Sequence, residues 1–295
     1  MAEPVRVGLA GAGPWARGVH APMLAAGPET ELAGVWSRTP ARAAELATAH
    51  GVPAFASYAD LLREVDAVAL AVIPAVQPDL AVAAADAGKA LLLEKPLALD
   101  VAGAERIAGA VAANGVGSVM VLTYRFADVV REFLADARAG TWHGARACFL
   151  SGAFLGGAFA GGWRLELGAV LDVGPHILDL VEAALGPVVD VTAQGDPQDW
   201  VAIQMQHESG ARSDVVLSCA SAIEPSRTEI ELYGRERSVS VDARAAARAE
   251  SFALMRAEFA AAARTGGPHP CDAARGLELQ RLIARVDAAL GTSGS

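Results

Sequence analysis

Aromatic residues, cysteine and long apolar runs are all scarce in this sequence. Aromatic side chains make up 5% of the 295 residues, and the longest apolar stretch, 67–76, is broken by Pro74 and too short to span a bilayer. No membrane partner is therefore expected. Cys148, Cys219 and Cys271 are odd in number and lack the paired spacing of metal ligands, so we predict free thiols and no metal site.

Positive charge is in short supply as well. Lysine and arginine number 24 against 34 aspartate and glutamate residues, which gives a net charge of -10 and argues against a nucleic-acid partner. The start, Met1-Ala2-Glu3-Pro4, has neither the basic residues nor the apolar core of a signal peptide. We therefore expect a cytoplasmic protein.

Length, glycine and aliphatic residues are what the chain does have. Hydrophobic residues make up 53% of it, with 30 glycines, which is typical of an α/β protein with tight turns. A chain of 295 residues is long enough for two cores. We predict a dinucleotide-binding domain over 1–124 and a domain for substrate binding and oligomerisation over 125–295.

The first motif is a glycine loop at the start of the chain. Val5–Ala10 predicts a short strand, and Gly11-Ala12-Gly13-Pro14-Trp15-Ala16 follows it before a helical segment. In a dinucleotide-binding loop Gly11 would permit the tight turn, Gly13 would let the pyrophosphate approach, and the small Ala16 would let the helix pack on the strand. The motif alone is a weak signal, and its position between a strand and a helix is what favours cofactor binding.

The second predicted strand, Glu31–Trp36, ends where an acidic residue normally binds the ribose of NAD. Ser37 and Arg38 stand there instead, and a hydroxyl beside a guanidinium suits the 2′-phosphate of NADP. NADP is favoured over NAD; in the alternative, Arg38 stacks on adenine or points to solvent and NAD is used. The predicted cofactor-binding residues of the two loops are Gly11, Gly13, Pro14, Trp15, Ser37 and Arg38.

Strands and helices alternate through the rest of the first half, as in a doubly wound parallel sheet. Predicted strands are Pro53–Phe55, Ala67–Ile73, Leu91–Leu93 and Val116–Leu122. Predicted helices are Pro40–His50, Gln77–Ala87 and Asp100–Ala113.

The second half has a different pattern. A strand at Ala145–Phe154 and a run of short alternating segments between Val188 and Val241 predict an open, mostly antiparallel sheet. Such a sheet leaves one face for a partner, and a homodimer or homotetramer is expected. Predicted helices are Asp128–Ala139, Gly168–Leu185, Ala245–Arg264 and Ala273–Leu290.

Glu94-Lys95-Pro96 ends the apolar strand at Leu91–Leu93. Ligands bind at the carboxyl edge of such sheets, so Lys95 can hold a substrate hydroxyl and Glu94 and Lys95 can adjoin the cofactor. Proline keeps the residue before it extended. The alternative is a surface ion pair that closes the strand.

Asp172 and His176 lie four residues apart in the predicted helix Gly168–Leu185, with Asp179 three residues further on. That spacing places an acid and an imidazole on one helix face, where histidine can take a hydroxyl proton near neutral pH. A buried histidine with a structural role is the alternative.

In their order, the glycine loop, Glu94-Lys95-Pro96, Tyr124-Arg125-Phe126 and the Asp172 to His176 segment resemble the Gfo/Idh/MocA family of glucose-fructose oxidoreductases and inositol dehydrogenases. The resemblance extends to the closing segment around Pro268-His269-Pro270-Cys271-Asp272. It implies a Rossmann domain, a second domain with an open sheet, and hydride transfer between a nicotinamide and a carbinol carbon of a sugar, cyclitol or related polyol.

The resemblance also implies residue roles. His176 would be the acid/base on the reacting hydroxyl, and Lys95 would hold and polarise that hydroxyl. Asp172 would bind a neighbouring hydroxyl of the substrate and orient the site. The Lys95–Pro96 bond would be cis, and His20 structural or close to the cofactor. The residues that would line the substrate site are Tyr124, Arg125, Trp163 and Arg164.

The chain departs from the family between Val241 and Ala253, where relatives carry more strand and loop. Two other functions on the same fold stay open: an NAD-dependent glycosidase that uses transient oxidation, and a cofactor-binding regulator without turnover. Regulators of this kind usually lack the lysine or the histidine, and both residues are present here.

Overall fold

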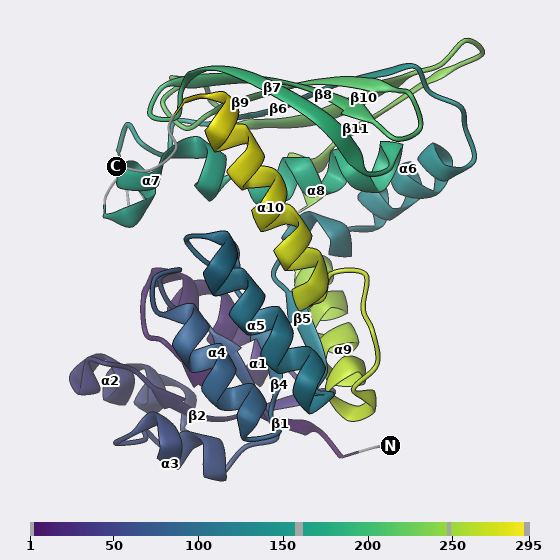
Figure 1. Ribbon diagram of the computed structural model, residues 1–295. Helices are drawn as coiled ribbons and strands as arrows, with labels where there is room; N and C mark the ends of the chain where they lie inside the picture. The colour runs from purple at the N-terminus through teal and green to yellow at the C-terminus, as the bar shows by residue number, and fades with distance from the viewer. Residues whose placement is uncertain (1–2, 157–161, 247–248, 292–295) are drawn as a thin grey trace. The chain divides into compact units, whose positions relative to one another are not determined.

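The structure is a computed structural model that describes residues 3–156, 162–246 and 249–291 (Figure 1). The chain divides into two compact units. The first comprises Met1–Val121 and Phe252–Leu277, and the second comprises Leu122–Ser251 and Glu278–Ser295. The predicted boundary at 124 lies close to the end of the first segment of the N-terminal unit, and Phe252–Leu277 also belongs to that unit.

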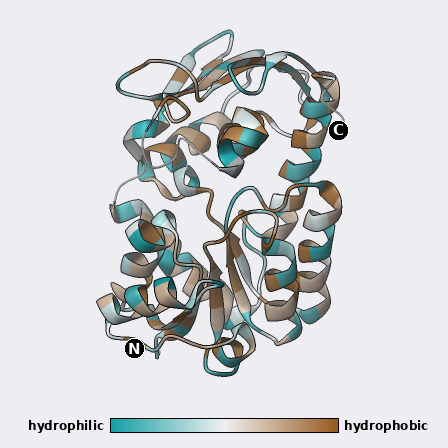
Figure 2. Cartoon of the chain, turned by 90° about the vertical axis from the view of Figure 1, so that its left-hand side faces the viewer, coloured by the Kyte–Doolittle hydropathy of each residue, from teal (hydrophilic) through white to brown (hydrophobic). Residues whose placement is uncertain are grey.

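The first unit is built on a five-stranded parallel sheet in the order β2-β1-β3-β4-β5. Every residue of β3 and β4 is buried, which explains their unbroken apolar sequences. In Figure 2 the central strands of the first unit are largely brown. The strands are β1 (Val5–Ala10), β2 (Thr30–Trp36), β3 (Ala67–Leu70), β4 (Ala90–Leu93) and β5 (Ser118–Met120). The expected strand at Pro53–Phe55 is a single bridge from Ala54 to Val35 beside β2.

Local signals set the helix ends of this unit. The Asp100 carboxylate accepts a hydrogen bond of 2.7 Å from the Gly103 amide at the start of α5, and Gly51 and Gly115 end α2 and α5 in the left-handed conformation. The helices are η1 (Ala16–His20), α1 (Ala21–Ala25), α2 (Pro40–His50), α3 (Tyr58–Arg63), α4 (Gln77–Asp86), α5 (Val101–Asn114) and α9 (Ala249–Thr265).

Side-chain and backbone contacts fix α9 and the segment after it to the first sheet. A Cβ at Gly117, just before β5, would lie 2.1 Å from the Ala262 carbonyl oxygen, so glycine is what permits α9 to approach. The buried Arg256 side chain donates to the Glu29 carboxylate at 2.8 Å. These contacts could not be inferred from local sequence, because their partners are more than 100 residues apart.

The second unit contains a six-stranded sheet in the order β11-β10-β6-β9-β8-β7. β6 and β9 pair in parallel and the other neighbours are antiparallel, so the predicted open, mostly antiparallel sheet is confirmed as a mixed sheet. Its strands are β6 (Gly144–Leu150), β7 (Val188–Asp196), β8 (Trp200–His207), β9 (Arg212–Ser218), β10 (Arg227–Tyr233) and β11 (Ser238–Asp242).

Helices α6, α7 and α8 pack against this sheet. Exposure alternates along β8, with Ala202, Gln204 and Gln206 exposed and their neighbours buried, so the opposite face is open in the chain described. Within the described residues, no helix is long and apolar enough to cross a membrane. The helices are η2 (Thr123–Phe126), α6 (Asp128–Arg138), α7 (Trp163–Asp172), α8 (Gly174–Leu185), η3 (Ala243–Ala246) and α10 (Ala273–Ala289), which belongs to this unit from Glu278 onward.

One predicted helix is wrong: Gly168–Leu185 is not continuous. α7 ends at Asp172 and α8 begins at Gly174. Pro175 has no amide to donate to the Leu171 carbonyl, so the ladder is interrupted, and the His176 amide bonds back to the Val173 carbonyl oxygen at 3.2 Å.

Candidate active site

The glycine loop follows β1, at the point where the sheet order reverses between β1 and β3. Gly11 has a φ of +127°, and a Cβ there would lie 2.1 Å from the Ala71 carbonyl oxygen. Gly13 is different: no heavy atom lies within 4 Å of the position its Cβ would take. The protein itself therefore requires glycine at 11, while the open space beside Gly13 fits a dinucleotide whose pyrophosphate approaches the backbone. Pro14 and Trp15 begin the helical turn that follows.

The loop after β2 carries the predicted 2′-phosphate residues. The Ser37 hydroxyl accepts a hydrogen bond of 3.2 Å from the Thr39 amide, and Arg38 is exposed. Sequence reasoning missed Arg17, whose guanidinium lies 2.8 Å from Glu45 on α2 and 3.3 Å from the Ala12 carbonyl oxygen. Arg17 therefore ties the glycine loop to α2 and holds the pKa of Glu45 below its usual value.

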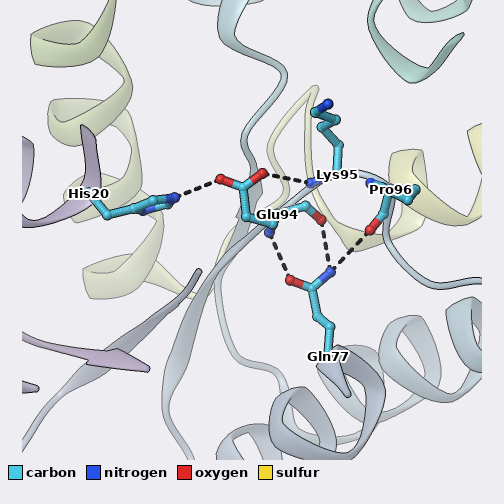
Figure 3. Close-up of polar contacts among 5 residues, drawn as sticks. All are labelled: His20, Gln77, Glu94, Lys95 and Pro96. Atoms are coloured by element: carbon cyan, nitrogen blue, oxygen red, sulfur yellow. Dashed lines mark hydrogen bonds and ion pairs between the residues drawn. The ribbon is translucent and has the colours of Figure 1, made fainter. Parts of the chain in front are cut away.

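Glu94 and Lys95 leave β4 in a turn whose Lys95–Pro96 bond is cis, as the resemblance implied. Glu94 is buried, and its carboxylate lies 2.6 Å from His20 Nε2 and accepts a hydrogen bond of 3.2 Å from the Lys95 amide (Figure 3). A surface ion pair does not describe this arrangement, because the Glu94 carboxylate is directed into the protein.

A residue that sequence reasoning missed, Gln77 at the start of α4, is fully buried beneath the same turn. Its side-chain nitrogen lies 2.8 Å from the carbonyl oxygen of Glu94, 2.9 Å from that of Leu97 and 3.3 Å from that of Pro96. Its side-chain oxygen accepts from the Glu94 amide at 2.9 Å. No sequence signal identifies Gln77, because a glutamine at a helix start is usually exposed.

Composition does single out Lys95. Lysine occurs only at positions 89 and 95, and the other 22 of the 24 lysine and arginine residues are arginine. In a chain that uses arginine almost everywhere, the edge of the sheet therefore carries a compact amine at Lys95 and not a planar guanidinium.

The second group of predicted residues lies in the second unit, at the junction of α7 and α8. Asp172 is the last residue of α7 and is buried, and Arg164 Nε lies 3.3 Å from its carboxylate. His176 is in the first turn of α8. The structure therefore sets the acid and the imidazole at a helix break and not on one continuous face.

Residues of η2 contact the first turns of α8. The Tyr124 ring meets the His176 ring edge-on with centroids 5.2 Å apart. Arg125 Nη1 lies 3.1 and 3.2 Å from the two carboxylate oxygens of Asp179, which is fully buried. Arg125 therefore holds α8, and its predicted contact with substrate stays a prediction. The side chain of Trp163 lies outside the described residues.

These features define a class. A parallel dinucleotide-binding sheet with its glycine loop, a lysine at the edge of that sheet, and a second mixed-sheet unit with an acid and a histidine are typical of two-domain nicotinamide-dependent oxidoreductases.

Comparison with known families agrees with that class. The family described as an oxidoreductase family with an NAD-binding Rossmann fold matches residues 5–123, and the GFO/IDH/MocA C-terminal domain matches residues 128–240. The chain belongs to the GFO/IDH/MocA family. The predicted family and fold class are confirmed, and the predicted enzyme class agrees with the description of that family.

Two curated relatives illustrate the range of the matches. A dTDP-3,4-didehydro-2,6-dideoxy-alpha-D-glucose 3-reductase of Saccharopolyspora spinosa is 30% identical over 60% of this chain and 54% of its own length. UDP-N-acetylglucosamine 3-dehydrogenase of Acidithiobacillus ferrooxidans is 29% identical over 81% of this chain and 74% of its own length. The chain spans 54 to 63% of the length of the first curated relatives that it matches.

Solved structures share the fold at low identity. The Acidithiobacillus ferrooxidans UDP-N-acetylglucosamine 3-dehydrogenase superposes with a TM-score of 0.85 at 24% identity, covering 98% of both chains. Scyllo-inositol dehydrogenase of Lactobacillus casei, solved with NAD(H) and scyllo-inositol, has a TM-score of 0.85 at 18% identity, covering 98% of this chain and 97% of that one. These similarities concern the fold.

Proposed function

We propose that the protein is an NAD(P)-dependent oxidoreductase that transfers a hydride between the nicotinamide and a CH–OH carbon of a sugar, cyclitol or related polyol. The observation that carries the proposal is that this chain, on the fold of the family, has both sets of residues. Lys95 lies at the sheet edge with its amide bonded to the Glu94 carboxylate, and Asp172 and His176 lie at the break between α7 and α8. Relatives whose names give sugar nucleotides and inositol as substrates support the substrate class.

The proposed roles follow from charge. His176 takes the proton of the reacting hydroxyl in the oxidation direction and returns it in reduction. The Lys95 ammonium stabilises negative charge that develops on that oxygen, and Asp172 accepts a hydrogen bond from a neighbouring hydroxyl. The bound cofactor supplies the hydride acceptor or donor. Tyr124, Arg125, Trp163 and Arg164 are the proposed substrate-binding residues.

We propose NADP as the preferred cofactor. Ser37 and the exposed Arg38 follow β2 at the position where NAD-binding proteins normally carry an acidic residue. A carboxylate there would repel a 2′-phosphate, whereas a hydroxyl beside a guanidinium can bind it. A titration with NADPH and, separately, NADH tests this through quenching of tryptophan fluorescence, since Trp36 ends β2 directly before Ser37. Arg38→Ala should weaken NADPH binding by roughly 10- to 100-fold and leave NADH binding almost unchanged. Tighter binding of NADH by the native protein would reject the NADP preference.

Turnover tests the reaction. A panel of sugars, sugar nucleotides and cyclitols is screened with either cofactor, and active substrates are assayed with Lys95→Ala, Lys95→Arg and His176→Ala. Each variant should lose at least about 100-fold in kcat, with Lys95→Arg no better than alanine because its planar guanidinium cannot replace a compact amine. Unchanged turnover in these variants would overturn the proposal.

The two other functions give different results. A glycosidase would carry tightly bound nicotinamide that is not consumed during turnover. A regulator would bind cofactor and show no turnover with any substrate of the panel.

A further inference from the structure

The backbone that carries Lys95 has left the sheet ladder. β4 ends at Leu93, and Glu94, Pro96 and Leu97 are buried beyond it. Buried carbonyl and amide groups in this position need partners other than a neighbouring strand. Gln77 provides these partners: its two N–H donors are shared among three carbonyl oxygens at 2.8, 2.9 and 3.3 Å from its nitrogen, and its oxygen accepts from the Glu94 amide at 2.9 Å.

We propose that Gln77 is the positioning residue for Lys95, an inference that rests on the role of Lys95 in the proposed function. Three carbonyl oxygens converge on the side-chain nitrogen of Gln77, and one amide donates to its oxygen. A carboxamide is suited to this arrangement because it holds a donor and an acceptor at one end. An ionised carboxylate would face the three carbonyl oxygens without a proton to donate.

The Lys95 side chain is held through its backbone. Figure 3 shows it extending away from Gln77, so the two side chains do not compete for the same groups. Gln77 bonds the peptide groups before and after Lys95, while the Glu94 carboxylate, bonded to fully buried His20, accepts from the Lys95 amide. The base of the lysine stem is therefore fixed on two sides, which sets where its Nζ can reach.

A first test needs no substrate. Because lysine occurs only at 89 and 95, an amine-acylating reagent followed by mass spectrometry gives the modification of Lys95 relative to Lys89 within one molecule. Gln77→Leu should raise that ratio and should speed hydrogen exchange at the Glu94 amide by roughly tenfold, the loss expected for one hydrogen bond. The matched control is Gln280→Leu, at a glutamine buried in the second unit whose side-chain oxygen has no hydrogen-bond partner.

A second test uses any substrate found in the panel. Gln77→Leu should lower kcat by roughly 100-fold with little change in cofactor affinity, and should lower it no further in a Lys95→Ala background. Relative to the native protein at the same pH, Gln77→Glu should be impaired at neutral pH and recover as the pH falls, because a protonated carboxyl can again donate to the carbonyl oxygens.

The outcomes separate this inference from the proposed function. Equal loss of kcat in the native and Lys95→Ala backgrounds, or an unchanged acylation ratio and unchanged exchange at Glu94 in Gln77→Leu, would overturn the positioning role. Absence of turnover in the native protein would instead reject the proposed function, and the acylation and exchange measurements would still decide the role of Gln77. If Gln77→Leu does not fold, Gln77→Glu gives the same readouts.

Discussion

At the scale of single residues, Gly11 and Gly13 separate what the fold requires from what a cofactor requires. A side chain at 11 would meet the Ala71 carbonyl oxygen in a backbone conformation that disfavours it, whereas a methyl group at 13 would meet nothing. Gly13→Ala should leave the free energy of unfolding within about 0.5 kcal/mol of the native value and still weaken NADPH binding. Gly11→Ala should lower both stability and binding.

Thermal unfolding and the fluorescence titration measure the two effects in the same samples. Unchanged NADPH affinity in a folded Gly13→Ala protein would contradict the assignment of the open space to the pyrophosphate. Gly109→Ala, in α5 and equally free of close atoms, is the matched control and should not affect binding.

We expect the stability of the protein to depend on pH because of the buried His207 on β8. Its ring nitrogens lie 2.7 Å from the Gly186 carbonyl oxygen and 2.8 Å from the Ser213 hydroxyl, and burial lowers the pKa of His207 despite the hydrogen bond to Gly186 and the charge of Glu182. The unfolded chain therefore binds a proton at a higher pH than the folded one. The stabilising contribution is complete above about pH 6.5 and is lost as the pH falls through the folded-state pKa.

Urea unfolding between pH 5 and pH 8 tests this. His207→Gln should be less stable at pH 8 and should show a shallower loss of stability towards pH 5 than the native protein. The same substitution at exposed His143 is the control. If the free energy of unfolding falls with the same slope between pH 8 and pH 5 in the native protein and in His207→Gln, the prediction is wrong.

Sequence patterns point to residues through their own type and place in a motif, such as Gly11, Ser37, Lys95 and His176, and the functional roles of these residues stay predictions. The patterns did not identify Gln77. Its importance comes from the turn that folds onto it, and a residue 17 positions away cannot be paired with that turn by local spacing.

At the scale of elements, η2 and α8 are joined by a buried ion pair. Arg125 and Asp179 have side-chain exposures of 11% and 1%. Asp179→Asn leaves the guanidinium without its charged partner, so the free energy of unfolding should fall by about 3 kcal/mol, and Arg125→Met/Asp179→Leu should be less destabilised than Asp179→Asn. Cofactor binding should be unaffected, since both residues lie in the second unit.

Urea denaturation with the fluorescence titration as control measures this pair. A loss below about 0.5 kcal/mol in Asp179→Asn would place the pair among the weak surface interactions. Tyr124, adjacent to Arg125, contacts His176, so loss of the pair should also lower kcat on any active substrate.

Strands buried on both faces and helices with clear end signals followed from sequence, as β3, β4 and α5 show. The break between α7 and α8 can be predicted from Pro175, because proline removes a helical donor. The four-residue spacing of Asp172 and His176 favours a continuous helix instead, and that prediction is wrong. The attachment of α9 depends on contacts such as Arg256 with Glu29, which no periodicity encodes.

At the scale of the whole molecule, the open face of the second sheet is where we propose that a second copy of the chain binds. Trp200 is 47% exposed, Ala202 is exposed two positions further along the same face of β8, and Ala202 lies beside Val216 of β9. Around them, Arg146 lies 3.9 Å from Glu231, and Gln204 donates to Asp214 at 3.0 Å. A small apolar centre with a polar surround is the pattern of protein interfaces.

Ala202→Arg places a charge in that centre. Because the side chain at position 202 is exposed in the single chain, the arginine should not prevent the subunit from folding. Light scattering after gel filtration should give a dimer or tetramer for the native chain and a smaller species for Ala202→Arg. Ala41→Arg on the exposed surface of α2 is the control and should keep the native mass. A native protein that is monomeric at tens of micromolar, or an unchanged mass in Ala202→Arg, would contradict the interface. NADPH binding retained by a monomeric Ala202→Arg would further show that the cofactor site is complete within one chain.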